Sequence, residues 1–529
     1  MSEASTQPRP AHDAPLPWWA LAPVAGVGGL AATLAFQPFN LWPLAFVAVA
    51  LLAWATRRAG GPGAAMAVGW TFGVLFMFTS LLWQTSIMVL SYAGLSLVMS
   101  LFYAVLGAGL HLTAHHRWAP LWGAGLWTLV EWVSSVFPFG GFAWMRLGYT
   151  QLDSWLAGFY PVAGAASVTF LVALIGHLLA HWVARRSLAR AAVAVVTTLV
   201  TVGVGWGGIA WSPPAEGADA VEVGWVQPGA PGGGVYGLGS ARTVTFNSKA
   251  ETGRLVDAVE AREWPQPDFI VWPENSTDMD LRQDATTRDA VTAAVEDAGV
   301  PILVGSIYTD EARQERQTVA VWWDGAVGPE LVYAKRNLVP FGEWIPFRDF
   351  FLPLVPQLAY VGHQSVPGQT PGAFTVTLPD GNPLRVGVAI CYEVIYPQTV
   401  VEAARGAEVM VVQSSNAMYQ GTNQIDQQFA ATRVRAAELR REILVVTTSG
   451  ISGLIGPRGD YVRAPDSIGA HGVHSMPRRT HTTPAMDLAA PVEYLGAAIG
   501  VIGLVVGLAS RRRLRAGGRL EGVPEQTGQ

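Results

Sequence analysis

The chain has 529 residues, of which half are hydrophobic and only 14% are charged, and it contains 21 tryptophans and one cysteine. The formal net charge of -5 argues against a nucleic-acid partner, and a single thiol cannot form an internal disulfide. A chain of this length has room for more than one domain.

The charges are distributed unevenly along the chain. Residues 1–211 contain four of the 39 acidic residues and eight basic residues, all of them arginine. This composition predicts a membrane domain over residues 17–211, preceded by a polar, disordered N-terminus over residues 1–16. Apolar runs long enough to cross a hydrocarbon core of about 30 Å recur in the domain. The predicted spans cover residues 17–37, 40–56, 63–84, 88–113, 119–137, 160–183 and 191–211.

The arginines between these spans predict the orientation of the chain. With a cytoplasmic N-terminus, the loops that contain Arg58, Arg117 and Arg186 all lie on the cytoplasmic side, as the positive-inside rule requires. A last span over residues 491–510 then returns the chain to the cytoplasm, where a basic tail over residues 511–529 follows. No basic segment precedes the first apolar run, so a cleaved signal peptide is not expected. The region before the last span is therefore predicted on the extracytoplasmic face.

Residues 212–490 form that region, and their pattern changes to strands that alternate with helices. This alternation predicts an α/β domain with helices outside buried sheets. Apolar runs predict strands at 221–226, 269–272, 302–307, 319–323, 331–333, 386–390, 409–412 and 443–447. Amphipathic runs predict helices at 249–262, 287–298, 399–407 and 423–441.

Three chemically reactive residues lie at the ends of predicted strands. Glu274 follows the predicted strand at 269–272, Lys335 is one of only two lysines in the chain, and Cys391 is its only cysteine. Strand ends are a usual place for catalytic groups on a sheet scaffold. A lone cysteine is by itself more often an inert buried residue. The position of Cys391 between a strand and a helix-like segment favours a nucleophile instead, because free backbone N–H groups there can hold an oxyanion.

The segments FIVWPEN, YAKRNLVPFGEW and VGVAICYE contain these three residues in this order. Together the segments resemble the three signature segments of the nitrilase, or carbon-nitrogen hydrolase, superfamily. The resemblance implies a four-layer αββα sandwich in which Glu274 is the general base and Cys391 the nucleophile. It implies that Lys335 is the cation that stabilises the thiolate and the tetrahedral intermediate, and that Glu343 supports this triad.

The chain as a whole resembles the apolipoprotein N-acyltransferase family of the bacterial inner membrane. The segment FPFGGFAWMRLGYTQ, between the fifth and sixth predicted spans, is similar to a Gly-rich stretch of that family. The resemblance implies transfer of an acyl chain from a phospholipid, through a thioester on Cys391, to the α-amine of a diacylglyceryl-cysteine on an apolipoprotein. It implies no cofactor and no metal, and it assigns Tyr392 and Glu393 to the shaping of the pocket.

Two segments depart from the pattern of this family, so their lipid and acceptor contacts cannot be carried over. They are Pro228–Gly234 and Ala417–Tyr419. Within the first, we interpret the run Gly232–Gly234 as a flexible loop rather than a phosphate cradle. Glu131 lies inside the fifth predicted span, where an acid is costly and usually functional, and it resembles a glutamate of the family. Its partner is not evident, because Ser134 and Ser135 stand where an arginine is expected.

The segment FRDFFLPLVPQLAYV, residues 347–361, is too short and too interrupted by proline to span a membrane. It is also too apolar for an ordinary surface loop. It is either a loop packed on its own domain or an arm that dips into the membrane interface beside the active site. His111, His115 and His116 have helical spacing, but no carboxylate is near them in sequence, so we interpret them as interfacial residues rather than metal ligands.

Two functions of other classes remain open alongside the acyltransferase. One is a membrane-tethered nitrilase or amidase that hydrolyses a small amide, and the other is a non-catalytic scaffold for another membrane enzyme. The combination of Glu274, Lys335 and Cys391 disfavours the scaffold. The membrane spans and the apolar insert disfavour a small soluble substrate.

Overall fold

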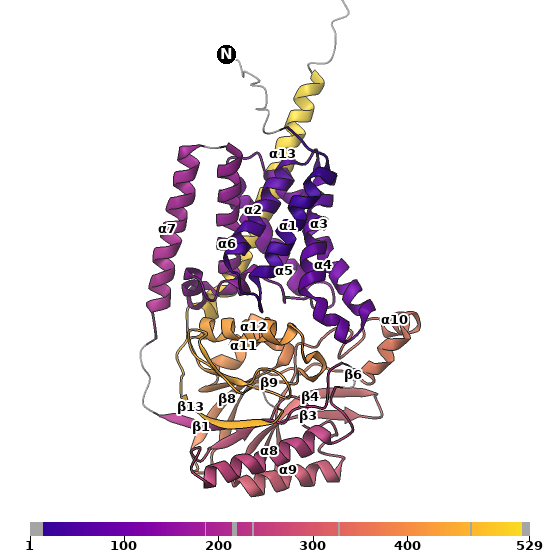
Figure 1. Ribbon diagram of the computed structural model, residues 1–529, viewed down its shortest axis with the longest axis vertical. Coiled ribbons are helices and arrows are strands. Elements are labelled where there is room, and N and C mark those ends of the chain that lie inside the picture. The colour runs from indigo at the N-terminus through magenta and orange to yellow at the C-terminus, as the bar shows by residue number, and fades with distance from the viewer. Residues whose placement is uncertain are drawn as a thin grey trace, which may run out of the picture.

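The computed structural model describes residues 14–185, 187–213, 219–234, 237–325, 328–465 and 468–520. A bundle of helices forms one end of the molecule and an α/β domain forms the other (Figure 1). The predictions for the first 13 residues, for Arg186 and for residues 521–529 lie outside the described residues.

Apolar helices make up the bundle, and each predicted span corresponds to one of them. They are α1 (Trp18–Ala35), α2 (Pro43–Arg58), α3 (Pro62–Ser80), α4 (Val89–Thr113), α5 (Ala119–Val136), α6 (Tyr160–Arg185), α7 (Leu188–Ala210) and α13 (Ala485–Leu520). Short 3-10 helices connect some of them: η2 (Leu82–Ser86), η3 (Leu147–Thr150) and η4 (Trp155–Phe159).

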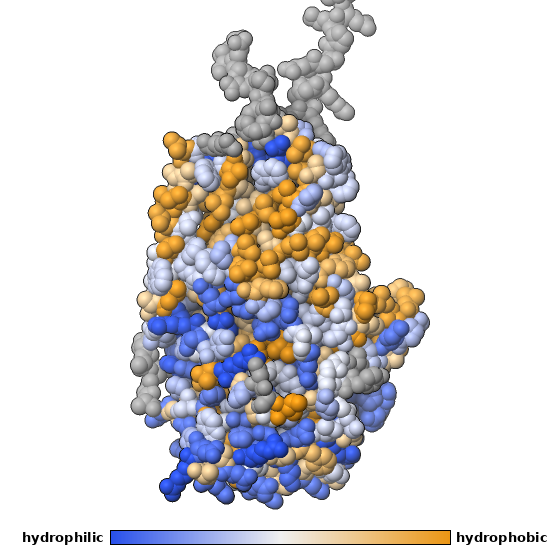
Figure 2. All heavy atoms as spheres, in the orientation of Figure 1, coloured by the Kyte–Doolittle hydropathy of each residue, from blue (hydrophilic) through white to orange (hydrophobic). Residues whose placement is uncertain are grey.

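The surface of the bundle is strongly hydrophobic, whereas that of the α/β domain is mostly hydrophilic (Figure 2). Among the described residues, six helical segments are long and apolar enough to cross a membrane: Trp18–Ala35, Pro62–Ser80, Val89–Thr113, Trp155–Ala184, Leu188–Ala210 and Ala485–Arg512. The helices α2 and α5 do not belong to this set, so the count of eight spans stays a prediction.

Glycine allows close packing of the bundle helices α3 and α4. A Cβ atom at Gly69 would lie 2.2 Å from the carbonyl oxygen of Tyr103, so no larger residue fits without moving a backbone. Small residues at such contacts are typical of helices that associate within membranes.

Two sheets form the centre of the α/β domain. In the described part of the chain, one sheet has the order β13-β1-β2-β3-β4-β5, with β6 paired to β4, and the other has the order β12-β11-β10-β9-β8-β7. The strands of the first sheet are β1 (Ala220–Gln227), β2 (Phe269–Val271), β3 (Ile302–Asp310), β4 (Glu315–Asp324), β5 (Gly328–Ala334), β6 (Gln364–Ser365) and β13 (Ala470–Pro477). Those of the second are β7 (Ala373–Thr377), β8 (Pro383–Ile390), β9 (Val409–Ser414), β10 (Ile443–Thr447), β11 (Gly453–Ile455) and β12 (Tyr461–Arg463).

The two sheets pack face to face, because side chains of both contribute to one buried cluster that includes Val223, Leu303, Val386 and Val411. Helices cover the outer faces: α8 (Thr243–Glu260) and α9 (Ala285–Ala298) on the first sheet, α11 (Pro397–Arg405) and α12 (Gln424–Leu439) on the second (Figure 1). This arrangement is the four-layer αββα sandwich that the resemblance implied, and the predicted fold class is confirmed.

The helix layer of α11 and α12 lies between the second sheet and the bundle (Figure 1). Buried residues of this layer and of the bundle form one continuous hydrophobic cluster. The α/β domain is therefore not tethered loosely to the bundle but packs against it through a shared core.

All the predicted strands and helices of the α/β domain form, but the prediction missed β6, β7, β11, β12 and β13. The insert is not an irregular loop, because it contains α10 (Arg348–Leu354) and η5 (Pro356–Val361). The last helix, α13, spans Ala485–Leu520, so it crosses both the predicted boundary at residue 490 and the predicted start of the tail at residue 511.

Candidate functional site

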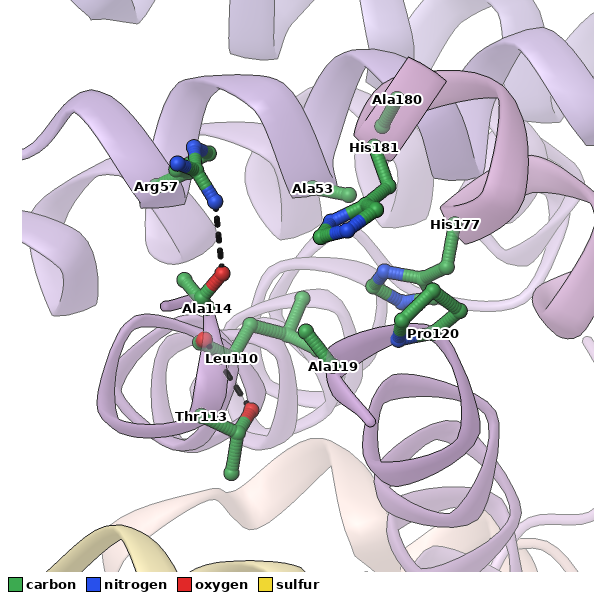
Figure 3. Close-up of a pocket in the computed structure, with 10 residues that line it drawn as sticks. All are labelled: Ala53, Arg57, Leu110, Thr113, Ala114, Ala119, Pro120, His177, Ala180 and His181. Carbon is green, nitrogen blue, oxygen red and sulfur yellow. Dashed lines mark hydrogen bonds between the residues drawn. The ribbon is translucent and has the colours of Figure 1, made fainter. Parts of the chain in front are cut away.

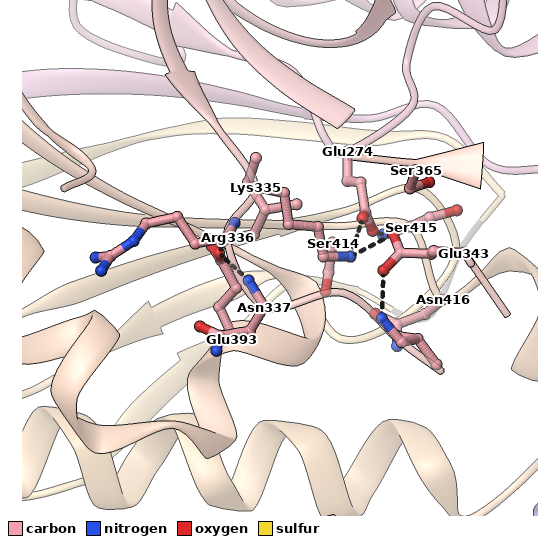
Figure 4. Close-up of polar contacts among 12 residues, drawn as sticks. Glu274, Lys335, Arg336, Asn337, Glu343, Ser365, Glu393, Ser414, Ser415 and Asn416 are labelled. Atoms are coloured by element: carbon pink, nitrogen blue, oxygen red, sulfur yellow. Dashed lines mark hydrogen bonds and ion pairs between the residues drawn. The ribbon is translucent and has the colours of Figure 1, made fainter. Parts of the chain in front are cut away.

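Lys335, directly after β5, lies at the centre of the candidate site (Figure 4). Its Nζ donates hydrogen bonds to Oε1 of Glu274 at 2.9 Å and to Oε1 of Glu343 at 2.8 Å. The remaining oxygen of each carboxylate accepts a backbone N–H, that of Glu274 from Ser415 and that of Glu343 from Val339. The ammonium group is thus held between two oriented carboxylates.

A close backbone approach brings Glu274 to this position. The Pro273–Glu274 peptide passes over β3 at Gly305, where a Cβ atom would lie 2.1 Å from the carbonyl oxygen of Pro273. Any residue other than glycine would displace the Glu274 segment. This contact explains how a residue after β2 reaches a lysine that follows β5, three strands further along the sheet.

Burial and charge act in opposite directions on Lys335. Burial alone lowers the pKa of its ammonium group, but the carboxylates of Glu274 and Glu343 raise it, and the result lies well above the ordinary value. Lys335 therefore stays protonated throughout the physiological range and can serve as a fixed positive charge.

Cys391 is the first residue of η6 (Cys391–Ile395), at the end of β8. Its φ of 52° lies in the left-handed region, which non-glycine residues rarely occupy and which recurs at functional sites. Burial raises the pKa of the Cys391 thiol to about 12, and the Glu274 carboxylate adds to this effect, whereas Lys335 and the Ser414 hydroxyl oppose it. At neutral pH the thiol is thus protonated, so attack on a carbonyl requires a base that takes its proton.

Glu393 joins the turn at Cys391 to the segment that follows Lys335. One of its oxygens accepts hydrogen bonds from Tyr333 Oη at 2.7 Å and from the backbone N–H of Arg336 at 2.6 Å. The other oxygen accepts the N–H of Ile390 at 2.7 Å. Glu393 is completely buried and connects the backbone just before Cys391 to the backbone just after Lys335.

A cavity of about 430 Å³ opens next to Cys391. Its walls are predominantly apolar and come from η2, α4, the segment after α5 and the insert. Trp83, Leu95 and Phe142 are among the lining residues on the bundle side, while Tyr392 and Gln428 line it on the side of the α/β domain. The cavity therefore joins the reactive thiol to the membrane part of the molecule.

The insert contributes to this cavity with one side only. Phe351, Val355 and Leu358 line the cavity, whereas Phe350 and Leu354 are 62% and 64% exposed. The helix α10 projects sideways from the α/β domain and carries a hydrophobic surface (Figures 1 and 2). The packed-loop interpretation accounts for the inner side of the insert but not for its exposed outer side.

Known proteins match both halves of this architecture. The protein-family model of the apolipoprotein N-acyltransferase N-terminal domain matches residues 28–178, and the family model of carbon-nitrogen hydrolases matches residues 238–473. An apolipoprotein N-acyltransferase from Mycolicibacterium smegmatis is 33% identical over 91% of this chain and 84% of its own. The chain belongs to the apolipoprotein N-acyltransferase family.

Further members of the apolipoprotein N-acyltransferase family match with similar extent. That from Coxiella burnetii is 28% identical over 83% of this chain and 90% of its own, and that from Methylococcus capsulatus is 28% identical over 96% and 99%. Among solved structures, a mutant amidase of the nitrilase superfamily from Nesterenkonia AN1 covers 53% of this chain and 99% of its own, at 15% identity and a TM-score of 0.38.

The two segments that depart from the pattern of apolipoprotein N-acyltransferases lie against each other. The N–H of Gly234 donates to the carbonyl oxygen of Met418 at 2.9 Å, and Gln420 Nε2 donates to the carbonyl oxygen of Gly232 at 2.7 Å. Tyr419 lines the cavity and packs edge-on against Trp83. The two segments therefore pack against each other, and Tyr419 of the second belongs to the cavity wall.

The structure supplies the partner of Glu131 that was not evident in the sequence. The carboxylate accepts the N–H of Leu147 at 2.9 Å and the hydroxyl of Thr169 at 2.7 Å, and it lies 3.6 Å from Arg146 Nε. Arg146 also pairs with Glu493 of α13. The arginine comes from the segment after α5, so its contact depends on the tertiary fold.

The histidines of α4 and the following loop have separate partners. His111 Nδ1 lies 2.9 Å from the carbonyl oxygen of Thr56, and His116 Nδ1 accepts a hydrogen bond from Trp122 Nε1 at 3.0 Å. No group of three metal-ligating side chains occurs among the described residues.

A cavity of about 30 Å³, enough for one or two waters, lies at the end of the bundle away from the α/β domain. His177 and His181 face this space, and Arg57 beside it donates to the carbonyl oxygen of Ala114 at 2.7 Å (Figure 3). No carboxylate, lysine or cysteine is among the residues that line it, whereas Cys391 lines the large cavity.

Several residues around the site were not foreseen from the sequence. Gln427 Oε1 accepts hydrogen bonds from Trp83 Nε1 at 3.0 Å and from Trp144 Nε1 at 2.7 Å, which fixes two cavity-lining tryptophans against α12. Gln424 and Gln428 also line the cavity. The unusual density of glutamine in the QIDQQ segment was the available signal, because buried amides need partners.

Proposed function

We propose that this protein transfers a fatty acyl chain from a membrane phospholipid, through a thioester on Cys391, to the α-amine of a diacylglyceryl-cysteine at the N-terminus of apolipoproteins. The observation that carries the proposal is the apolar cavity, which extends from the bundle to Cys391. Such a cavity suits an acyl chain, and the acid, amine and thiol at its end suit acyl transfer. Membership of the acyltransferase family supports the same reaction.

In the first half-reaction, Sγ of Cys391 attacks the carbonyl carbon of the phospholipid ester while Glu274 takes the thiol proton. Lys335 stabilises the negative charge that develops. The ester C–O bond then breaks, and the lysophospholipid oxygen leaves with the proton from Glu274. The acyl group remains on Cys391 as a thioester.

In the second half-reaction, the free amine of the lipoprotein attacks the thioester carbonyl and gives a proton to Glu274. The C–S bond breaks, the sulfur recovers the proton, and the product is an amide. One base thus serves both half-reactions, because Glu274 is free to accept a proton again after the lysophospholipid leaves.

Both substrates are lipids, so we place the reaction at the membrane. In this proposal the bundle lies in the bacterial inner membrane and the α/β domain on its extracytoplasmic face. The exposed Phe350 and Leu354 of α10 enter the membrane interface and admit the phospholipid. The low water content of the apolar cavity protects the thioester from hydrolysis until the acceptor arrives.

The decisive experiment follows the acyl group on the purified protein. Incubated with phospholipid alone, the protein gains the mass of one acyl chain, which neutral hydroxylamine removes and which the Cys391→Ala variant does not acquire. Addition of a diacylglyceryl peptide with a free N-terminal amine discharges the adduct into an amide, whereas the N-acetylated peptide leaves it in place. Release of free fatty acid with neither adduct nor amide would identify a hydrolase instead.

A further inference from the structure

Gln413 is a polar residue in the apolar layer between the two sheets. Side chains alternate along a strand, so Val409, Val411 and Gln413 of β9 point to the same face. The two valines belong to the buried cluster between the sheets, and Gln413 is completely buried. A polar side chain in such a layer is costly unless its groups find partners, so its contacts indicate what it does.

The amide of Gln413 reaches from the second sheet to the first. Its Nε2 donates to the carbonyl oxygen of Trp272 at 2.6 Å and to that of Leu303 at 3.2 Å. Both partners are backbone carbonyl oxygens, which can only accept, so the NH₂ group must face them and the orientation of the amide is fixed. Its Oε1 has no hydrogen-bond partner among the described residues.

One end of this bridge holds the segment of the proposed base. Trp272 follows β2 and lies two residues before Glu274. The N–H of Ser415, two residues beyond Gln413, donates to Glu274 Oε2 at 2.9 Å. The end of β9 therefore holds the backbone before Glu274 through a side chain and the carboxylate of Glu274 through a backbone N–H.

The other end of the bridge leads to the nucleophile. β9 pairs in parallel with β8, and Gln413 is the register partner of Ile390, the residue before Cys391. Glu274 extends from the first sheet and Cys391 from the second, and no ladder of backbone hydrogen bonds joins the two sheets in the described part of the chain. The separation of base and nucleophile therefore depends on contacts across the sheet interface.

We propose that Gln413 is a positioning residue for acyl transfer, which holds the Glu274 segment of one sheet in place relative to the Cys391 strand of the other. In taking Glu274 as the base and Cys391 as the nucleophile, this inference rests on the proposed function. The unpaired Oε1 supports a role beyond stability. A buried acceptor without a partner costs about as much as a hydrogen bond contributes, so the bridge adds little to folding.

The test measures acylation of Cys391 by a water-soluble short-chain ester in the full-length protein, as the rate at which the adduct mass appears. Gln413→Met keeps the length of the side chain and removes the amide. A misplacement of about 1 Å can lower a rate about 100-fold, so we expect the maximal rate to fall about 10- to 100-fold. The ester concentration at half-maximal rate is expected to stay the same, because Gln413 is not among the residues that line the cavity.

Gln227→Met is the matched control. Gln227 follows Val223 and Trp225 on the same face of β1, is 5% exposed, and accepts a hydrogen bond from Ser452 Oγ of the second sheet's side at 2.7 Å. It therefore also bridges the sheet interface, but its partner lies between β10 and β11 rather than beside Glu274. We expect its melting temperature to fall at least as much as that of Gln413→Met, and its acylation rate to stay within about twofold of the original.

A double variant separates positioning from general destabilisation. If Gln413 acts through Glu274, Gln413→Met lowers the rate by less than about twofold in the Glu274→Gln background, because the base that it positions is already gone. A merely structural effect would multiply the loss caused by Glu274→Gln. Gln413→Asn, whose amide is one methylene too short to reach both carbonyl oxygens, is a second variant that keeps a polar group in place and is also expected to react slowly.

An original acylation rate in Gln413→Met and Gln413→Asn overturns the proposal, and so does an equal loss in Gln227→Met or a multiplied loss in the double variant. The assay needs neither phospholipid nor lipoprotein, so its outcome is separate from that of the transfer assay. Slowed, non-additive acylation in a protein that forms no amide product would uphold the role of Gln413 and overturn the proposed function. Unslowed acylation of the variants of an active transferase would do the reverse.

Discussion

Glu274 has two effects on Cys391 that oppose each other. As a negative charge it raises the pKa of the thiol and so disfavours the free thiolate. In the proposed mechanism it is also the base that takes the thiol proton when attack begins. Under that proposal the thiol stays protonated in the resting protein and becomes nucleophilic only when a carbonyl is present, which limits unwanted reactions of the only cysteine in the chain.

Because Glu274 both raises the thiol pKa and is the proposed base, replacing it by glutamine should have opposite effects on thiol ionisation and on acyl transfer. The variant loses the charge that raises the thiol pKa but retains Lys335, so a larger fraction of thiolate forms at neutral pH. We expect alkylation by iodoacetamide to become several-fold faster while acyl transfer falls by at least about 100-fold, because the general base is gone. Parallel measurement of alkylation and of amide product on the same preparation checks both parts.

Glu343→Gln is the matched control for this variant, since Glu343 has a weaker influence on the thiol pKa than Glu274. Its alkylation rate is expected to rise less. Slower alkylation of Glu274→Gln than of the unaltered protein would contradict the assigned electrostatics, and full transferase activity would contradict the assignment of Glu274 as the base.

From the sequence we could select Glu274, Lys335 and Cys391 as candidates, and the structure places Glu274 and Lys335 in contact, but their surroundings could not be predicted. Glu274, Lys335 and Cys391 are recognisable because each follows an apolar strand and falls within a recognisable segment. Gln424 and Gln428 belong to another element, and only the packing of α12 brings them to the cavity beside Cys391. The partnership of Arg146 with Glu131 was missed for the same reason, because it depends on how the segment after α5 folds back.

At the scale of elements, the insert shows why composition alone left two interpretations open. An apolar segment lines a cavity with one side and exposes the other, so it is both packed and exposed. Hydrophobic composition does not distinguish these sides, because the same residue types serve both.

We predict that lysine at Phe350 or Leu354 slows acyl loading from phospholipid. Each apolar side chain that enters the membrane interface contributes about 1.5–3 kcal/mol, so its loss corresponds to about a tenfold or greater decrease in loading. Loading from a water-soluble short-chain ester is expected to be unchanged, because that donor does not require contact with the interface. The measurement is the rate at which the thioester adduct forms with each donor.

Val462→Lys provides a matched control, since Val462 is also 62% exposed but lies on the edge strand β12. It is expected to load from both donors at the original rate. Equal loading of the Phe350→Lys and Val462→Lys variants from phospholipid would show that α10 does not contact the membrane.

Three of the strands that sequence analysis missed in the α/β domain, β7, β12 and β13, lie at the edges of the two sheets. The predicted strands are buried and apolar, whereas all three residues of β12 are exposed and β13 contains two histidines. Edge strands have one unpaired side and fewer buried positions, so their hydrophobic pattern is weak. Their pairing is set by neighbouring strands rather than by their own composition.

At the scale of the whole molecule, one strand pair joins the two ends of the α/β domain. The first strand, β1, pairs with the last, β13, in antiparallel register from Ala220 with Pro477 to Gln227 with Ala470. The chain therefore enters the domain from α7 and leaves it to α13 on the same side, which allows both helices to belong to one bundle. The α/β domain is in effect an insertion between the last two helices.

The same bundle explains how the basic residues are placed. The N–H of Leu16 donates to the carbonyl oxygen of Arg58 at 2.8 Å, and Arg57 donates to the carbonyl oxygen of Ala114. The start of the chain, the end of α2 and the loop after α4 thus meet at the end of the bundle that lies away from the α/β domain (Figure 1). By the positive-inside rule we expect this end to be cytoplasmic and the α/β domain to lie outside.

Reporter fusions test this topology and also decide between eight spans and six. If all eight helices cross the membrane, reporters after Arg58 and after Arg117 both read cytoplasmic. If α2 and α5 do not cross, both positions change to the outside. A reporter within residues 252–280 reads external in either case, because the number of crossings before the α/β domain is odd with or without α2 and α5.

We expect cytoplasmic readings at Arg58 and Arg117, since the contact between Leu16 and Arg58 requires α2 to return to the side from which α1 starts. A cytoplasmic reading within residues 252–280 would separate the catalytic domain from exported lipoproteins and contradict the proposed function.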